Sequence, residues 1–247
     1  MITLRRHELL WVLEQCGAGD WPYPLAGMAW PADTEDETVL ARARTEDALA
    51  GRGLLAPGPA ADLLAVGTAV RDARRQVDLV RRGSGPTAAV ALAGPGGGAL
   101  LTSADHAGAD VTVRPVAPGG IAAAVLALLP RLPPAPGPPL EVPPPETAVA
   151  TRRRERRRLD VDAVLADTVA WTQLGVAVTP IGATWADDRA DAHITWLDSP
   201  RGRHRLRHDR GRTTSPAQAR LVPDDAASPG TRAEVEAWLV EPGRSTT

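Results

Sequence analysis

The spacing of apolar residues divides the chain into helical and extended segments. Apolar side chains recur at helical spacing from His7 to Gln15, and Thr34 with Glu37 forms a capping box that opens a second helix ending near Gly51. Residues 60–73 are predicted to form a separate, third helix. After this point the apolar period changes from about 3.6 residues to about 2, which is the period of a strand. The pattern therefore predicts a group of helices followed by a group of strands.

The strands of the first half are separated by short turns. The runs that predict them are residues 76–79, 88–92, 99–102 and 110–116. An apolar stripe over residues 119–129 then predicts a helix. Consecutive strands joined by short turns pair antiparallel, and their apolar face must be buried by a layer of helices.

The second half repeats this order after a proline-rich connector at residues 131–146. Prolines exclude an internal helix there, but Leu140 and Val142 could add an edge strand. The expected elements that follow are a helix at 152–165, strands at 173–179, 192–197, 202–207 and 213–218, and a helix at 231–240 capped by Ser228.

We therefore expect one α+β domain over residues 1–247, with a central antiparallel β-sheet built from two meanders and flanked by helices. The first half spans residues 1–130 and the second half residues 147–247, in a pseudo-twofold arrangement. The pattern leaves open whether the two meanders join into one sheet or pack separately.

Composition removes several classes of function. The net charge is −2, so the whole chain has no bias towards polyanions, and all 28 basic residues are arginine, which makes arginine the default cation here. The single cysteine, Cys16, excludes an intramolecular disulfide. No signal peptide and no apolar run of about 18 residues is present, so we expect a soluble, cytoplasmic protein without membrane insertion.

No set of residues has the spacing of a catalytic or metal site. The run Gly94–Ala99 fits G-x-G-x-x-A but lacks the helix that a dinucleotide site requires, which favours a hairpin turn. His204 and His208 would lie about 13 Å apart along a strand, too far to share one ion. We expect no enzyme activity, no cofactor, no metal and no small-molecule substrate.

Arginine-rich segments suggest an alternative function. The segment His193–Arg212 has the pattern of a β-hairpin, and its second strand, Arg201–Arg212, is rich in arginine. Together with Arg152–Arg158, this strand could form an arginine-rich nucleic-acid-binding or regulatory module. However, the run Arg152–Arg158 lacks interleaved aromatic residues and is followed by acidic ones, which is typical of a solvated helix start. Tryptophans in loops, at Trp21, Trp30 and Trp185, are the best indication in the sequence of a protein-binding surface. For any single one of them, burial in the core is the more common outcome.

Several phrases of the sequence resemble those of one protein family. They cover nearly the whole chain, and none is a catalytic motif. They are LRRHELLWVLEQCG with its W-P-Y-P-L turn, the segment Arg42–Leu55 with its A-G-R-G-L end, Val77–Val80, Leu174–Val178, Trp196–Arg203 and Thr213–Ala217. By these phrases the chain is similar to the EspG family, the cytosolic chaperones of actinobacterial type VII (ESX) secretion.

The resemblance implies a chaperone that binds PE–PPE heterodimers near the tip of the PPE helical hairpin and keeps them soluble for export. The expected partners are PE–PPE-type proteins or other ESX substrates, and the chain itself would be a monomer or homodimer. The stretch between Leu140 and Trp171 departs from the family, because it is shorter than a second helical bundle and richer in arginine and proline. The contact residues that we propose from the sequence are Ser84, Gly85, Pro86, Arg203, Arg205 and Arg207.

Overall fold

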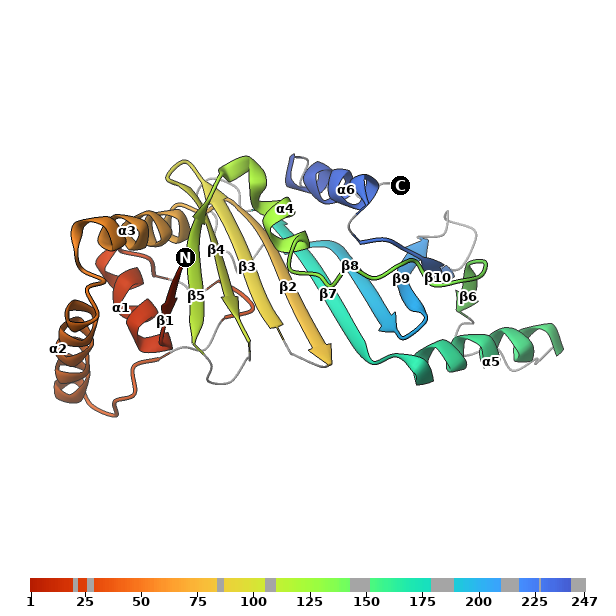
Figure 1. Cartoon of the computed structure of the whole chain (residues 1–247), viewed down its shortest axis with the longest axis horizontal. Helices are drawn as coiled ribbons and strands as arrows, with labels where there is room; N and C mark the ends of the chain where they lie inside the picture. The colour runs from red at the N-terminus through yellow and green to blue at the C-terminus, as the bar shows by residue number, and fades with distance from the viewer. Residues whose placement is uncertain are drawn as a thin grey trace.

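The two meanders join into one antiparallel sheet of ten strands (Figure 1). The computed structural model describes residues 1–19, 22–25, 29–83, 87–104, 110–142, 152–178, 189–209, 218–226 and 228–240. The strands of the first half are β1 (Ile2–Leu4), β2 (Arg75–Gly83), β3 (Thr87–Gly94), β4 (Gly97–Ser103) and β5 (Val111–Val116). Those of the second half are β6 (Leu140–Val142), β7 (Ala170–Val178), β8 (Arg189–Ser199), β9 (Gly202–Asp209) and β10 (Gln218–Pro223).

The strand order has the pseudo-twofold arrangement that the sequence predicted. The sheet runs β1-β5-β4-β3-β2-β7-β8-β9-β10-β6. Strands β2 and β7 pair antiparallel at the centre, with Leu79 opposite Leu174. From this seam outward, the first half consists of β2, β3, β4 and β5, and the second half of β7, β8, β9 and β10. A short strand, β1 or β6, forms the outer edge of each half, and each comes first in its half along the chain. The α+β fold class with a central antiparallel sheet is confirmed.

Helices cover different parts of the two faces. In the described part of the chain the α-helices are α1 (Arg6–Gln15), α2 (Glu35–Gly51), α3 (Pro57–Arg71), α4 (Ile121–Leu126), α5 (Arg152–Asp167) and α6 (Pro229–Val240), with a 3-10 turn, η1, at Pro118–Gly120. Helices α1 and α3 pack on one face of the first half, whereas α4 and α6 cover the opposite face near the seam. Helix α5 lies at the other end of the molecule, beside β6 (Figure 1).

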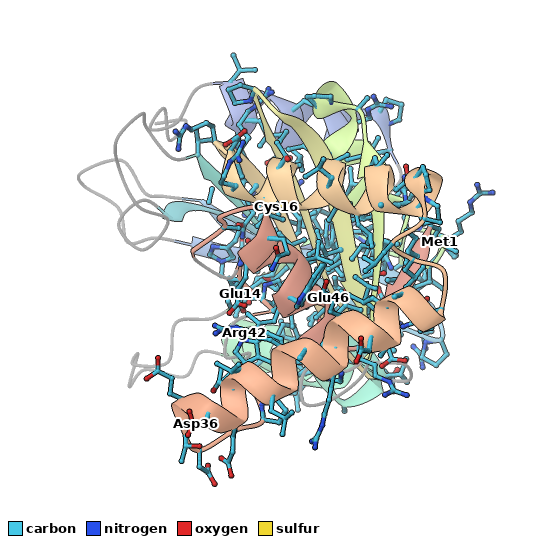
Figure 2. All side chains as sticks on the ribbon, turned by 90° about the vertical axis from the view of Figure 1, so that its left-hand side faces the viewer. Met1, Glu14, Cys16, Asp36, Arg42 and Glu46 are labelled. Atoms are coloured by element: carbon cyan, nitrogen blue, oxygen red, sulfur yellow. The ribbon has the colours of Figure 1, made fainter. Side chains whose placement is uncertain are left out.

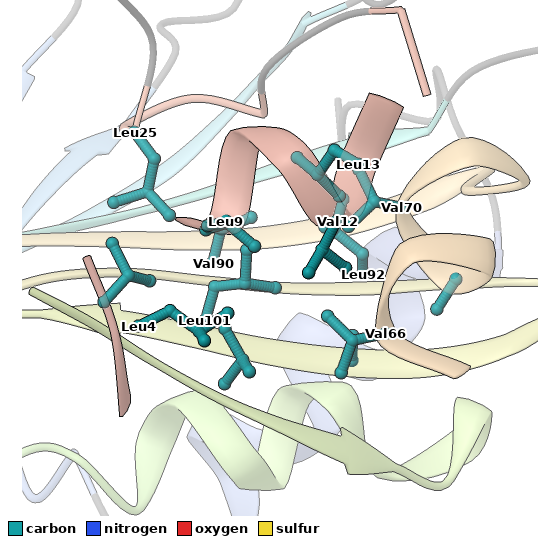
Figure 3. Packing of buried hydrophobic residues seen from close by; sticks show 14 of the residues in the cluster. Leu4, Leu9, Val12, Leu13, Leu25, Val66, Val70, Val90, Leu92 and Leu101 are labelled. Carbon is teal, nitrogen blue, oxygen red and sulfur yellow. The ribbon is translucent and has the colours of Figure 1, made fainter. Parts of the chain in front are cut away.

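Strand β3 shows how the sequence divides the core into two layers. Its side chains alternate between faces, so Val90 and Leu92 pack with Leu9 and Leu13 of α1 (Figure 3). The intervening Ala89, Ala91 and Ala93 face α4, where their short side chains let the helix approach the sheet closely. Each large apolar side chain buried in this way stabilises the fold by about 1.5–3 kcal/mol.

The helix boundaries follow local signals in the sequence. The Thr34 hydroxyl accepts a hydrogen bond from the Glu37 amide at 3.2 Å, and Ser228 Oγ accepts one from the Thr231 amide at 3.2 Å, so both predicted caps are confirmed. Helix α4 is shorter than the predicted 119–129, because the chain turns at 127–129 ahead of Pro130, which disfavours helical geometry in the residue before it.

The proline-rich connector crosses the sheet and supplies an edge strand. The Arg203 amide donates to the Pro133 carbonyl at 2.9 Å, and the Ala135 amide donates to the Arg203 carbonyl at 2.9 Å. Residues Leu140–Val142 then pair with β10 as the outermost strand, as their sequence predicted. Of the strand predicted at 213–218, residues 213–217 lie outside the described part, and Gln218 begins β10.

Candidate functional site: a partner-binding surface

The residues that the sequence proposed as partner contacts fall into three groups. Ser84, Gly85 and Pro86 lie outside the described residues, between the ends of β2 and β3. Arg203 and Arg205 are buried, with 1% and 5% of their surface exposed. Arg207 is exposed on β9. Only Arg207 among the three arginines is therefore placed at a surface where it can meet a partner.

Arg203 is an internal ion-pair residue. Its Nε and Nη2 atoms donate to the two carboxylate oxygens of Asp198 at 2.6 and 3.0 Å, and its guanidinium lies 6.0 Å from the ring centre of Trp196. Arg81 of β2 adds a second cation 3.8 Å from Asp198. Because Asp198 is also buried, the pair is screened little by water, and loss of either partner would leave a buried charge.

Arg205 connects the sheet to the final helix. Its two terminal nitrogens donate to the carboxylate oxygens of Glu234 on α6, both at 2.6 Å. Arg203 and Arg205 therefore lie on a part of β9 that is buried beneath α6 and the connector, whereas Arg207, further along the same strand, is exposed. Both arginines can be buried because each forms an ion pair, Arg203 with Asp198 and Arg205 with Glu234, which offsets the cost of removing the charge from water.

The turn between β8 and β9 contacts the connector and lies next to Val169, which follows α5. Ser199 Oγ donates to the Gly202 carbonyl at 3.0 Å and accepts from the Arg201 amide at 3.2 Å, which closes the turn. Gly202 has φ +130°, and a Cβ there would lie 2.7 Å from the Pro133 carbonyl oxygen, so the connector requires glycine. Beside this turn, the Val169 amide donates to the Asp198 carbonyl at 2.9 Å.

Helix α5 and the adjoining ends of β2 and β7 form an exposed surface, which we call the α5 edge. Its apolar members are Leu159, Leu165 and Val169, which are 63%, 52% and 58% exposed. Gly83 at the end of β2 pairs with Ala170 at the start of β7, so the two strand ends lie side by side next to the end of α5 (Figure 1). Exposed apolar side chains grouped beside polar ones are typical of protein-binding sites.

Arg82 and Trp171 complete the α5 edge. They are paired across the β2–β7 seam, and the Arg82 guanidinium lies 5.8 Å from the centre of the Trp171 ring. Arg82 is exposed, whereas Trp171 is half-buried. The stacking holds the arginine at the surface in a restricted set of conformations, which lowers the entropy lost when it binds a partner.

The opposite end of the molecule has a different construction. Trp30 Nε1 donates to Glu14 Oε1 at 2.8 Å, and Arg42 of α2 donates to both Glu14 oxygens at 2.9 and 3.0 Å (Figure 2). Burial alone would raise the pKa of the Glu14 carboxyl, but these hydrogen bonds outweigh it and hold the pKa below its ordinary value. Trp30 is therefore engaged within the chain, and Trp21 and Trp185 lie outside the described residues.

The described residues contain neither a candidate metal site nor a helix that could span a membrane. No group of three or more His, Cys, Asp or Glu side chains in the described part of the chain is placed to hold a metal ion. The glycine run after β3 is the β3–β4 hairpin turn, with Gly94 opposite Gly97, as predicted. Among the described helices, none has both the length and the apolar character needed to cross a bilayer.

Comparison with known proteins identifies the family. The model of the EspG family matches residues 6–238. The protein belongs to the EspG family. Among solved structures, this EspG chain is similar to EspG5, a type VII secretion system chaperone from Mycobacterium tuberculosis solved in complex with a PE25–PPE41 dimer. The TM-score is 0.63 at 13% sequence identity, over 98% of this chain and 96% of EspG5, so the likeness shows the fold. No curated protein sequence matches.

Sequence reasoning missed most of the α5 edge of this EspG protein. Arg82 and Trp171 are 89 positions apart in the chain and meet only because β2 and β7 pair at the seam. Leu165 and Val169 lie four apart and could have been noticed as an apolar pair, but their exposure depends on how α5 sits against β6. In the part of Leu140–Trp171 that the structure describes, α5 is the single helix.

Proposed function

We propose that this EspG-family protein is a cytosolic chaperone of type VII secretion that binds helical substrates of the PE–PPE type and keeps them soluble for export. The observation that carries the proposal is the family match over residues 6–238. The solved complex of EspG5 with a PE25–PPE41 dimer supports it, because that chaperone has the same fold over nearly the whole chain.

The α5 edge is the proposed binding surface. A chaperone of this kind needs an exposed apolar patch beside polar groups. The α5 edge supplies exposed Leu165 and Val169, and Val169 precedes Ala170, which pairs with Gly83 beside Arg82. We propose that Ser84, Gly85 and Pro86 extend this surface, since they follow Gly83 at its border. Non-enzymatic function is part of the same proposal, because binding and release of a helical client require no chemistry.

The experiment is co-expression with each PE–PPE-type gene pair from the same genome, followed by affinity purification through a tag on the chaperone. We expect at least one pair to co-purify in a stoichiometric complex and to become soluble only when the chaperone is present. If every pair tested is equally soluble with and without the chaperone, and none co-purifies, the proposed function is wrong.

Two matched variants locate the surface. Leu165→Asp places a charge in the α5 edge, whereas Leu64→Asp places one at a similarly exposed leucine on α3, 59% exposed at the other end of the molecule. We expect Leu165→Asp to reduce co-purification strongly and Leu64→Asp to leave it unchanged. Equal effects of the two variants would contradict the proposed location.

The nucleic-acid alternative has less support. Arg203 and Arg205 are ion-paired with Asp198 and Glu234 inside the fold, which removes two cations from the arginine-rich hairpin. Binding to mixed DNA at about 50 mM salt that weakens steeply as salt rises would support this alternative.

A further inference from the structure

Arginine and tryptophan side chains stack on each other at three places in the described part of the chain. The first joins Arg42 and Trp30, with the guanidinium 5.6 Å from the ring centre. Here a carboxylate completes the pair, because Glu14 accepts hydrogen bonds from both the guanidinium and the indole N–H. The result is a unit of three side chains in which every polar group that faces the others is satisfied.

The second unit is buried and is also completed by carboxylates. Arg203 lies 6.0 Å from the ring centre of Trp196 and donates two hydrogen bonds to Asp198. The indole N–H of Trp196 donates to Asp224 Oδ2 at 2.7 Å. In both units, therefore, the arginine and the indole nitrogen each have an acidic acceptor.

The third pair, Arg82 and Trp171, has no such acceptor among the described residues. Among the side chains that the structure describes, Arg82 forms no ion pair with a carboxylate, and the Trp171 indole N–H forms no hydrogen bond. Asp198 cannot serve, because it pairs with Arg81, whose side chain points to the opposite face of the sheet. Asp78 shares the face of Arg82 but is four residues away, about 13 Å along the strand.

We propose that a carboxylate of the client protein completes this third unit. The inference rests on the proposed function, and it assigns to the client an aspartate or glutamate beside the apolar residues that cover Leu165 and Val169. The planar fork of arginine binds a carboxylate through two parallel hydrogen bonds, and the indole N–H adds a third donor, as it does at Glu14. Arginine and tryptophan are also the residue types most enriched at the energetic centres of interfaces.

The location makes the pair suited to this role. Arg82 precedes Gly83 and the segment 84–86, and its partner Trp171 follows Val169 by two residues, so the pair lies within the α5 edge. Because Arg82 is exposed in the free protein, its guanidinium keeps its water until a client arrives, and the chain carries no cost of burying an unpaired charge.

The test measures binding of a co-purified PE–PPE-type client by titration calorimetry. We expect Arg82→Ala to weaken binding by about 10- to 100-fold, as loss of a charge-assisted bidentate contact does. Arg44→Ala, which removes an exposed arginine on α2, is the matched control and should leave the affinity within about twofold. Unchanged thermal melting of both variants confirms that the fold is intact.

A charge exchange identifies the client residue. Arg82→Glu should abolish binding, and one Asp→Lys or Glu→Lys variant at the tip of the client should restore it. If wild-type protein binds no client at all, the proposed function fails. If wild-type protein binds but Arg82→Ala binds equally well, or no exchange restores Arg82→Glu, this inference fails and the proposed function stands.

Discussion

The replacement Asp198→Ala removes the one carboxylate that holds Arg203 and also faces Arg81. Arg203 is 1% exposed, so its guanidinium would remain buried without a partner. Removing one partner of a buried ion pair costs about 3–5 kcal/mol. For a chain of this length that corresponds to a melting temperature lower by roughly 6–20 °C.

The loss of stability is measured by unfolding the protein in guanidinium chloride and following the transition by circular dichroism. Arg201→Ala is the matched control. Arg201 lies in the same turn, but it is 75% exposed, and its ion pair with Asp167, at 3.6 Å, is exposed as well. We expect the control to change stability by less than about 0.5 kcal/mol. The double variant with Arg203→Met should recover part of the loss, since it removes the orphaned charge. A loss below about 1 kcal/mol for Asp198→Ala would show that Arg203 does not depend on Asp198 for its burial.

Three further predictions concern the core, a helix contact and pH. Val125→Asp, at a fully buried position of α4, should destabilise by at least about 3 kcal/mol in the same unfolding assay. Gly67→Ala should destabilise by about 1–3 kcal/mol, because its Cβ would contact the Cys16 sulfur, and Cys16→Ala in the same chain should recover part of that loss. Glu14→Gln should be less stable than the wild type above about pH 5, with the difference shrinking as pH falls below 4.5, because the lowered pKa means that the carboxylate stabilises the fold only while ionised. An equal difference at pH 7 and pH 3.5 would show that the Arg42 ion pair contributes nothing.

Local order was predictable from the sequence because it depends on near neighbours. Thr34 and Ser228 identified two helix starts, and Gly94 and Gly97 identified a hairpin, since caps and turns are set within four residues. Even the edge strand at Leu140–Val142 followed from alternation after prolines. Such signals were enough to establish the order of elements and the two meanders.

What could not be predicted depends on contacts between distant segments. The pattern of β9 places an arginine at every second position, which is equally consistent with a solvated face and with a buried face lined by carboxylates. The choice is made by Asp198 on β8 and Glu234 on α6, whose positions follow only from the register of the sheet. For the same reason the pairing of Arg82 with Trp171 across the seam had no local signal.

The contrast between ion-paired arginines inside the fold and exposed Arg82 supports a binding role for the α5 edge. Arginines inside the sheet are matched by carboxylates and hold the β8–β9 hairpin, the connector and α6 together. Arg82, in contrast, is stacked and exposed, and it lies beside exposed Val169. A rigid sheet of this kind presents a prearranged surface to a client and needs little ordering on binding.

Whether a client binds at the α5 edge can be measured by hydrogen–deuterium exchange on the chaperone, alone and with a co-purified PE–PPE-type client. We expect the client to slow exchange in the segment 83–87 and in α5, and to leave exchange in α2 unchanged. Protection confined to α2, or the same exchange everywhere with and without the client, would contradict binding at the α5 edge.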